Sequence, residues 1–271
     1  MGPRGLWPLV SVIVVNYRRP DLAAATLDSL QRCTYPALEV VLVDDDADVD
    51  DGPLWESYCP GVKYVRSGTR LGRARATNVG IARSSADLVL ALGPTTVVEP
   101  DFLEPMVMML RGDSRVGIVS PHVVVDGERD RGEEVGLLSG ACMLARRTLF
   151  DPDYVGGLAE CYATDSEQRD FAGRARRFGF VAAHCSHALV SRQRSPCEEH
   201  ERPREIYHAH LDRVALSRRL LDGWSFAAFA VRYLSVEAPL SAWRYARRGC
   251  WANARAVARA LWWHATHATP A

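Results

Sequence analysis

The chain has 271 residues, of which 48% are hydrophobic and 24% are charged, and its formal net charge is zero. This composition is typical of a folded globular protein, and the length allows one large domain with an appendage or two small domains. A zero net charge excludes the overall positive field of a typical nucleic-acid-binding protein. No uncharged segment reaches the roughly 18 residues that a membrane-spanning helix needs.

The N-terminal residues and the cysteines both indicate the cellular compartment. The start, MGPRGLWPLVSVIVV, runs directly into a strand-like apolar pattern, and no small-residue cleavage site of a secretory signal follows. The seven cysteines are scattered: Cys33, Cys59, Cys142, Cys161, Cys185, Cys197 and Cys250. An odd, unclustered set is typical of reduced thiols. We therefore expect a cytoplasmic protein.

The first half of the chain alternates strand and helix patterns. Apolar, β-branched runs predict buried strands at residues 10–15, 39–44, 62–65, 88–92 and 116–120. Helices are predicted from Pro20 to before Pro36, within residues 71–85, and over residues 101–110. Strands that alternate with helices indicate an α/β fold with a mostly parallel sheet covered on both faces.

The pattern changes after Gly136. Residues 136–150 predict a strand that enters a helix, residues 166–180 predict an arginine-rich helix, and short strands are expected around residues 180–190. Residues 193–205 are charged and contain proline, as in a loop or linker, and the chain beyond Ile206 has helical patterns. We therefore divide the chain into a domain of residues 1–205 and a helical C-terminal extension of residues 206–271.

Several segments, in order along the chain, carry a resemblance to a known family. They are VSVIVVNYRRPDLAAATLDSL, YPALEVVLVDD, LGRARATNVGIARSSADLVLAL with VVEPDFLEPM, GACMLARRTLFDPDYVGGL, and RARRFGF. Together they extend over about residues 8–190, and the chain resembles the inverting GT-A glycosyltransferases of family 2, especially the rhamnosyltransferase-like branch. The resemblance implies a Rossmann-like GT-A sheet with a UDP- or dTDP-sugar at the carboxyl ends of its strands. It also implies transfer of the sugar, with inversion, to a hydroxyl of a glycan, a lipid-linked acceptor or a small natural product.

The resemblance places the nucleotide of the donor against the first two strands. Asp44 ends the second predicted strand, and the matching acid of the family binds the uracil or thymine ring, with Asp45 beside it. A carboxylate at a strand end is a good acceptor for a ring N–H. Val15 and Asn16 are expected to frame the base through backbone groups. The alternative for Asp44 is that it only caps a turn.

A second set of expected donor contacts lies in LGRARATNVG. Small residues here allow the helix to approach the nucleotide and the sheet closely. Gly72 and Arg73 open the helix, which is a natural place for phosphate, and Asn78 matches an asparagine that lies near the donor in the family. The alternatives are a solvated face for the arginine and a helix-surface amide for Asn78.

The stretch ALGPTTVVEPD (residues 91–101) matches the turn that holds Mg²⁺ or Mn²⁺ in the family, but its acids are missing. Gly93 and Thr95 occupy the two ligand positions. A divalent cation on a diphosphate requires hard, preferably anionic oxygens. We therefore expect no metal ligands at this turn and assign Thr95 a donor contact only.

The segment that carries the general base in the family also differs. Glu167 and Asp170 are retained, whereas Gln168 replaces the aspartate that would be the base. Since an amide cannot accept a proton from an acceptor hydroxyl, we name Asp165 and Glu167 as candidate bases and Asp170 as a third catalytic candidate.

Arginine replaces a third element linked to the metal. Arg192, with Arg194 two residues on, falls near a family histidine that helps to hold the cation. One hypothesis is metal-independent transfer, in which Arg192, Arg194 or Arg73 stabilises the leaving diphosphate. A second hypothesis is a catalytically inactive nucleotide-binding or scaffold protein of the same fold. The third is slow catalysis with a weakly held metal.

The C-terminal extension interleaves aromatic and basic residues. The tryptophans are Trp224, Trp243, Trp251, Trp262 and Trp263, and the arginines among them are Arg232, Arg244, Arg247, Arg248, Arg255 and Arg259. This pattern favours peripheral contact with a membrane, on its inner face for a cytoplasmic protein. The alternative is that these helices pack on the catalytic domain or on a second copy of the chain in a homodimer.

Overall fold

The structure is a computed structural model, and it describes residues 7–45, 49–93, 95–125, 128–129, 140–164, 166–192 and 203–266. The chain divides into two units. One unit comprises residues 1–160 and 167–194, and the other comprises residues 161–166 and 195–271.

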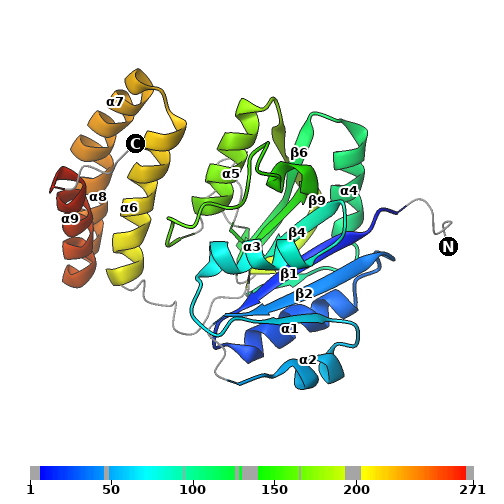
Figure 1. Cartoon of the computed structure of the whole chain (residues 1–271). Coiled ribbons are helices and arrows are strands. Elements are labelled where there is room, and N and C mark those ends of the chain that lie inside the picture. The colour runs from blue at the N-terminus through cyan, green and yellow to red at the C-terminus, as the bar shows by residue number, and fades with distance from the viewer. Residues whose placement is uncertain are drawn as a thin grey trace. The chain divides into compact units, whose positions relative to one another are not determined.

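The first unit is organised around a nine-stranded sheet with the order β3-β2-β1-β4-β8-β6-β9-β5, in which β7 pairs with β6 (Figure 1). The strands are β1 (Val10–Asn16), β2 (Leu38–Asp44), β3 (Lys63–Arg66), β4 (Leu88–Leu92), β5 (Thr96–Val98), β6 (Val116–Val125), β7 (Glu128–Arg129), β8 (Cys142–Arg146) and β9 (Val181–Arg192). Strands β1, β2, β3, β4, β6 and β9 run in one direction, whereas β5, β7 and β8 run in the opposite one. The predicted α/β fold with a mostly parallel sheet is therefore confirmed.

Helices cover both faces of this sheet. They are α1 (Pro20–Gln31), α2 (Gly52–Tyr58), α3 (Arg73–Arg83), α4 (Leu103–Gly112) and α5 (Ser166–Arg177). In β1, Val12 and Val14 belong to the apolar cluster that includes α1 and α4, whereas Ile13 and Val15 belong to the cluster beneath α3. Successive strand residues alternate between faces, so a continuous apolar run supplies both clusters at once.

Gly80 of α3 shows how closely a helix approaches the sheet. A Cβ at this position would lie 2.4 Å from Cγ2 of Ile13 and 3.0 Å from Cγ2 of Val43. Since the helix can reach this depth only without a side chain, the expectation that small residues bring this helix close to the sheet is confirmed for its contact with the sheet.

The structure corrects several details of the predicted elements. Helix α2 and strand β5 were not predicted, because both are short and neither has a full period of apolar residues. The helix expected after β8 is a 3-10 turn, η1 (Arg147–Phe150). The short strands expected around residues 180–190 form the single strand β9, whose pairing with β6 shifts register between Pro121 and His122.

The second unit consists of helices α6 (Pro203–Leu220), α7 (Gly223–Arg232), α8 (Ala238–Arg247) and α9 (Trp251–Thr266), with a π-helical turn, η3 (Tyr233–Glu237), between α7 and α8 (Figure 1). Its small core contains Ile206, Tyr233, Ala238, Ala256 and Val257. Helix α7 buries none of its residues. In the part of the chain that the structure describes, no helix combines the length and apolar character needed to cross a membrane.

Candidate functional site

The carboxyl ends of the parallel strands place a set of polar residues on one edge of the sheet. Asn16 and Asp44 end β1 and β2 and are register partners, and Arg192 ends β9. We call this edge the carboxyl edge. Open α/β sheets bind their ligands at such an edge, so the fold itself makes it the candidate site.

Asp44 lies at the centre of a buried hydrogen-bond network on this edge. The Asn16 amide donates to Asp44 Oδ1 at 2.8 Å, and the Tyr64 hydroxyl donates to Asp44 Oδ2 at 3.0 Å. Burial raises the pKa of Asp44, and the two hydrogen bonds oppose this rise. Each carboxylate oxygen has lone pairs left for a further donor, so the group can still accept an N–H from a ligand.

Asp45 has a structural role, because its carboxylate accepts hydrogen bonds from the turn before α3. Its Oδ1 accepts the backbone N–H of Leu71 at 2.6 Å, and its Oδ2 accepts that of Gly72 at 3.0 Å. Gly72 has φ 83 and ψ 158, a conformation that favours glycine. Asp45 therefore fixes the start of α3 at the carboxyl edge, where we expect Gly72 and Arg73 to meet phosphate.

Two further residues at this edge were missed by the sequence analysis. Tyr17 directly follows β1 and is 38% exposed, and the guanidinium carbon of Arg70 lies 4.7 Å from the centroid of its ring. Such a stacked pair can flank a planar heterocycle. The position of Tyr17 directly after a strand that ends at the site was the available sequence signal, whereas nothing in the sequence indicated Arg70.

The turn between β4 and β5 is packed tightly against residues 140 and 141. The Gly93 N–H donates to the Ala141 carbonyl at 2.7 Å, and the Thr96 hydroxyl donates to the same oxygen at 3.0 Å. A Cβ on Gly93 would lie 3.2 Å from the Gly140 carbonyl oxygen. Position 93 therefore has no room for a larger side chain. Position 95, the other expected ligand position, has such room because Thr95 is partly exposed.

Arg192 lies beside this turn. It is the register partner of Thr96 in the antiparallel pair of β5 and β9. Strand partners lie about 5 Å apart, so the structure brings Arg192 to the turn at which the sequence lacks acids. Arg194 lies outside the described residues.

The candidate bases lie at the start of α5. Glu167 is 3% exposed and forms an ion pair with Arg73, with 2.5 Å between Oε1 and Nη2. Gln168, which is 4% exposed, has a buried Oε1 with no hydrogen-bond partner among the described residues. Asp165 lies outside the described residues. The structure therefore brings Glu167 and Arg73 together across 94 residues of sequence.

Asp170 is fully buried and accepts a hydrogen bond from Arg174 Nε at 2.7 Å. The same guanidinium donates to the carbonyls of Val155 and Gly157. This arrangement makes Asp170 the partner of a side chain that holds the loop before α5. A direct catalytic role for Asp170 stays a prediction.

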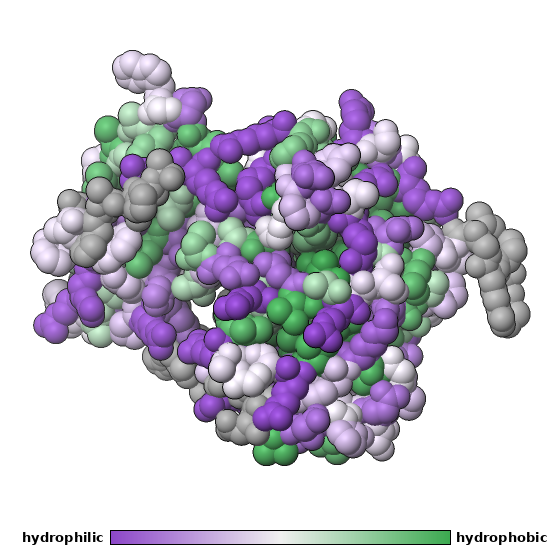
Figure 2. All heavy atoms as spheres, in the orientation of Figure 1, coloured by the Kyte–Doolittle hydropathy of each residue, from purple (hydrophilic) through white to green (hydrophobic). Residues whose placement is uncertain are grey.

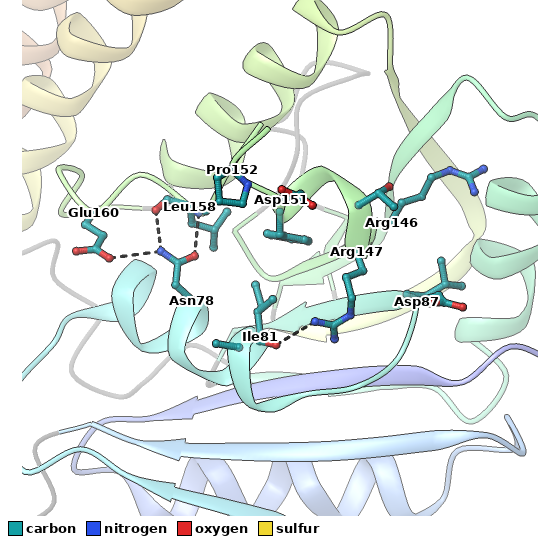
Figure 3. A pocket seen from close by; sticks show the side chains of 14 residues that line it. Asn78, Ile81, Asp87, Arg146, Arg147, Asp151, Pro152, Leu158 and Glu160 are labelled. Atoms are coloured by element: carbon teal, nitrogen blue, oxygen red, sulfur yellow. Dashed lines mark hydrogen bonds between the residues drawn. The ribbon is translucent and has the colours of Figure 1, made fainter. Parts of the chain in front are cut away.

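Asn78 is bonded to the same loop. Its Nδ2 donates to the Leu158 carbonyl at 2.9 Å, and its Oδ1 accepts the Leu158 N–H at 2.8 Å. Glu160 Oε1 is 3.5 Å from Nδ2, and Figure 3 shows these contacts between α3 and the loop. Since both ends of the amide are engaged, the structure gives Asn78 a role in positioning the loop, and its expected donor contact stays a prediction.

A groove of about 1050 Å³ begins at Asn78 (Figure 3). It extends past Ile81 to Asp87, which directly precedes β4. Two arginines on its wall are bound to backbone carbonyls, Arg146 to that of Val116 and Arg147 to that of Ile81. The groove therefore leads towards the amino ends of the strands and away from the carboxyl edge.

The residues at the β4–β5 turn do not fit a divalent cation. The described residues contain no group of three or more histidine, cysteine, aspartate or glutamate side chains that could hold a metal ion. Gly93 has no side chain, and a threonine hydroxyl at position 95 is a weak ligand for Mg²⁺ or Mn²⁺.

Comparison with known sequences identifies one family. The sequence matches the model described as Glycosyl transferase family 2 over residues 11–151, which is just over half of the chain. An uncharacterized glycosyltransferase of Haemophilus influenzae is 28% identical over 111 residues, which cover 41% of this chain and 37% of that protein. An N-acetylglucosaminyltransferase of Rhizobium sp. (strain N33) is 28% identical over 131 residues, covering 46% and 29%. The chain thus spans well under half the length of these curated relatives.

Solved structures show a similar fold. A mannosyltransferase from Pyrobaculum calidifontis, in complex with GDP-Man and Mn²⁺, has a TM-score of 0.66 at 20% identity and covers 97% of this chain and 77% of its own. Residues 1–349 of TarS from S. aureus, in complex with UDP-GlcNAc, have a TM-score of 0.63 at 18% identity, covering 84% and 73%. At these identities the likeness concerns the fold alone.

Proposed function

Because the chain belongs to glycosyl transferase family 2, we propose that it transfers a sugar from a UDP- or dTDP-sugar to an acceptor hydroxyl with inversion. The observation that carries this proposal is the buried network of Asn16, Asp44 and Tyr64 at the carboxyl edge, beside the fixed start of α3. The network offers a carboxylate to a pyrimidine N–H, and the helix start offers backbone N–H groups and Arg73 to a diphosphate. We propose that the pyrimidine ring of the donor lies against Val15 and Asn16.

The acceptor hydroxyl must lose a proton to a base near α5. Glu167 supports this role because its carboxylate pairs with Arg73, the first residue of α3, and this helix begins at the carboxyl edge. In the described structure it is paired with Arg73, and a cation beside a carboxylate makes that carboxylate a weaker base. We propose that the diphosphate of the donor draws Arg73 away and so frees Glu167. Asp165 is the alternative base.

We propose that arginine stabilises the leaving nucleoside diphosphate. Arg192 supports this proposal by its position opposite Thr96, and Arg73 supports it by its position at the start of α3. Arg194 is the third candidate. A fixed guanidinium can form two parallel hydrogen bonds to phosphate oxygens and stabilise negative charge as it develops. The residues at the β4–β5 turn do not fit a cation, so the proposed stabilisation of the diphosphate depends on arginine alone.

The direct test is a calorimetric titration of UDP and dTDP in EDTA and in Mn²⁺, followed by assays of donor hydrolysis and transfer under the same conditions. We expect binding without metal and turnover that persists in EDTA. Binding that requires Mn²⁺ would show that ligands other than the turn residues hold a cation, and it would overturn the metal-independent mechanism while leaving the transferase assignment in place.

A second function, a nucleotide-binding scaffold without catalysis, is favoured by the engagement of the acids. Glu167 is paired with Arg73 and Asp170 with Arg174, and Gln168 cannot act as a base. This alternative predicts that UDP or dTDP binds while no donor is turned over, and that the protein co-purifies with a partner. Turnover of any nucleotide sugar that is lost on Glu167→Gln would exclude it.

We also propose that the helical unit contacts a membrane surface peripherally. Large apolar side chains are exposed on it: Trp224 (89%), Val231 (68%), Trp251 (62%) and Trp262 (69%). Figure 2 shows hydrophobic and hydrophilic residues side by side on the visible face of this unit. Interleaved aromatic and basic residues suit the interfacial region of a bilayer.

Vesicle co-sedimentation of the wild type and of the double variant Trp224→Ala/Trp262→Ala tests this proposal, and equal binding of the two proteins would contradict it. Packing on a second copy is the alternative, which sedimentation without vesicles would reveal.

A further inference from the structure

The four helices of the second unit carry more basic than acidic side chains. Residues 203–266 contain ten arginines and four acidic residues, although the whole chain has a net charge of zero. Three of these four acids already have partners. Glu237 pairs with Arg213 and Arg232, Asp222 caps α7, and Asp212 accepts hydrogen bonds from residues 163 and 164. Within residues 203–266, arginines therefore outnumber the acidic side chains.

Part of this surplus lines a groove between α6 and α9. The groove has a volume of about 590 Å³, which is within the range of small-molecule sites. Helix α6 contributes Arg204, Tyr207 and His208, and α9 contributes Arg255 and Arg259. The spacing of three or four residues places the contributions of each helix on one face. Alanines at the other α9 positions leave the groove open between the basic side chains.

The polar groups of the groove are all suited to an anion. The guanidinium of Arg259 lies 5.6 Å from the centroid of the Tyr207 ring, which orients it. No carboxylate is among the described residues that line the groove. Within the described ranges, Arg204 and Arg255 make no ion pair or side-chain hydrogen bond, in contrast to Arg213 and Arg232 on the same unit. Like charges held together destabilise one another until an anion binds between them.

We propose that this groove is a binding site for a phosphate or diphosphate group. Guanidinium groups bind phosphate oxygens in pairs and with defined geometry, and three of them with a neighbouring imidazole match the charge of a phosphate dianion or a diphosphate. The volume of the groove exceeds that of the anion alone, so there is room for the group to which the phosphate is attached. The anion comes either from a soluble phosphate compound or from the headgroup of an anionic lipid. This site is independent of the carboxyl edge and of the proposed transfer reaction.

The test uses the full chain and a pair of charge-matched double variants. Arg255→Gln/Arg259→Gln removes two groove arginines, whereas Arg218→Gln/Arg219→Gln removes two exposed arginines of α6 that do not line the groove. Inorganic pyrophosphate is titrated by calorimetry, and any binding at the carboxyl edge is common to both variants. We expect the groove variant to weaken pyrophosphate binding about tenfold or more and the control less than about twofold. Arg204→Gln, at an exposed position of α6, should weaken it in the same direction.

A second arm separates the two sources of the anion. Co-sedimentation is measured with phosphatidylcholine vesicles with and without phosphatidylglycerol. Groove-dependent binding to pyrophosphate alone supports a soluble ligand, and groove-dependent binding to the anionic vesicles supports a lipid headgroup. Equal losses in the two double variants would mean that only the general positive charge of the helices matters. No groove effect in either arm would mean that the groove does not bind the anion. Either result would overturn the proposal. Circular dichroism of each variant checks that the helices are retained.

Discussion

The guanidinium of Arg73, the first residue of α3, forms an ion pair with the carboxylate of Glu167 in the first turn of α5, with 2.5 Å between Nη2 and Oε1. Glu167 is almost completely buried, whereas the Arg73 side chain is 28% exposed. The contact joins the helix that opens at the proposed phosphate site to the helix that carries a proposed base. Whatever binds Arg73 therefore changes the environment of Glu167.

Single variants of the two partners should separate catalysis from nucleotide binding. Glu167→Gln should reduce transfer by roughly 10²–10⁴-fold, the usual effect of losing a general base, and should leave UDP affinity nearly unchanged. Arg73→Gln should mainly weaken UDP binding, because it removes a cation from the diphosphate. Steady-state kinetics and calorimetry separate the two effects, with Glu104→Gln on α4 as an exposed control. If Glu167→Gln keeps full activity, Asp165 becomes the candidate base.

Asp44→Asn tests the nucleotide end of the site. Burial raises the pKa of Asp44, so the folded protein binds a proton more tightly than the unfolded chain does, and the ionised carboxylate destabilises the fold above the raised pKa. This cost disappears as the pH falls through that pKa. We expect the variant to be more stable than the wild type near pH 7, and the difference to shrink in acid.

The same variant should bind UDP more weakly, by about tenfold or more, because the amide N–H of the new side chain would face the N–H of the uracil ring. Urea denaturation at several pH values and calorimetry of the same samples check the two parts. A variant that is less stable near neutral pH would show that the carboxylate is needed for the fold, whatever its role in binding.

Glu39 provides a contrasting case at the opposite edge of the sheet. Burial raises its pKa, but hydrogen bonds from Lys63, Ser11 and Ser85 outweigh this effect and bring the pKa to about 2. Because this value lies below the unfolded one, Glu39 stabilises the protein above the unfolded pKa, and the stabilisation is lost as the pH falls from about 4.5 towards 2.

Glu39→Gln should therefore cost on the order of 2 kcal/mol near pH 7 and much less below pH 3. Denaturation curves at several pH values measure this difference. Asp28→Asn, a partly exposed acid of α1 with a hydrogen bond from Tyr58, is the control. A cost that does not depend on pH would mean that Glu39 acts through its shape and not through its charge. Donor affinity should not change, because Glu39 lies at the amino ends of the strands.

The sheet could be predicted from the sequence because its strands are continuous apolar runs. Residues 10–15 and 39–44 have no other stable place than the interior of a covered sheet. The network around Asp44 was only half predictable. Asp44 and Asn16 end their own strands, whereas Tyr64 enters through the pairing of β2 with β3, which a local pattern does not reveal.

The contacts that join distant segments could not be predicted. Arg73 and Glu167 were each identified as candidates, but for separate tasks, since charge alone does not say which of 33 basic and 33 acidic residues will meet. The position of Arg192 beside the turn likewise depends on β5, a three-residue strand that was missed. In these places the topology of the sheet, and not the local sequence, determines which side chains become neighbours.

Restoring an acid to the β4–β5 turn should create a metal dependence. Thr95 is partly exposed, so Thr95→Asp can be accommodated, and we expect Mn²⁺ to strengthen UDP binding by this variant about tenfold, because a carboxylate is a far better ligand than a hydroxyl. Thr95→Asn is the isosteric control. The comparison is calorimetric, in EDTA and in Mn²⁺.

Gly93→Asp should fail for a steric reason. Its Cβ would meet the Gly140 carbonyl oxygen at 3.2 Å and Thr96 Oγ1 at 3.3 Å, and we expect a loss of about 1–3 kcal/mol in stability. If Thr95→Asp gains nothing from Mn²⁺ while the protein remains folded, Thr95 does not face the diphosphate, and its proposed donor contact is wrong.

Asp212 of α6 is buried, with only 5% of its surface exposed. Its Oδ2 accepts hydrogen bonds from the backbone N–H groups of Ala163 and Thr164, at 3.0 Å and 2.7 Å, and from the Thr164 hydroxyl at 2.7 Å. These residues immediately precede Asp165 and the start of α5. One carboxylate of the helical unit thus holds the segment that leads into the proposed base.

Asp212→Ala leaves two N–H groups without their acceptor, at a cost of about 1–3 kcal/mol each, and should speed hydrogen exchange at residues 163 and 164. If this anchor positions the base, transfer should fall while UDP affinity is retained, and Asp212→Asn should restore part of the rate because its carbonyl can still accept one of the bonds. Asp222→Ala, which removes the exposed N-cap of α7, controls for general loosening of the helices. Faster exchange with an unchanged rate of transfer would show that the anchor stabilises the segment without positioning the base.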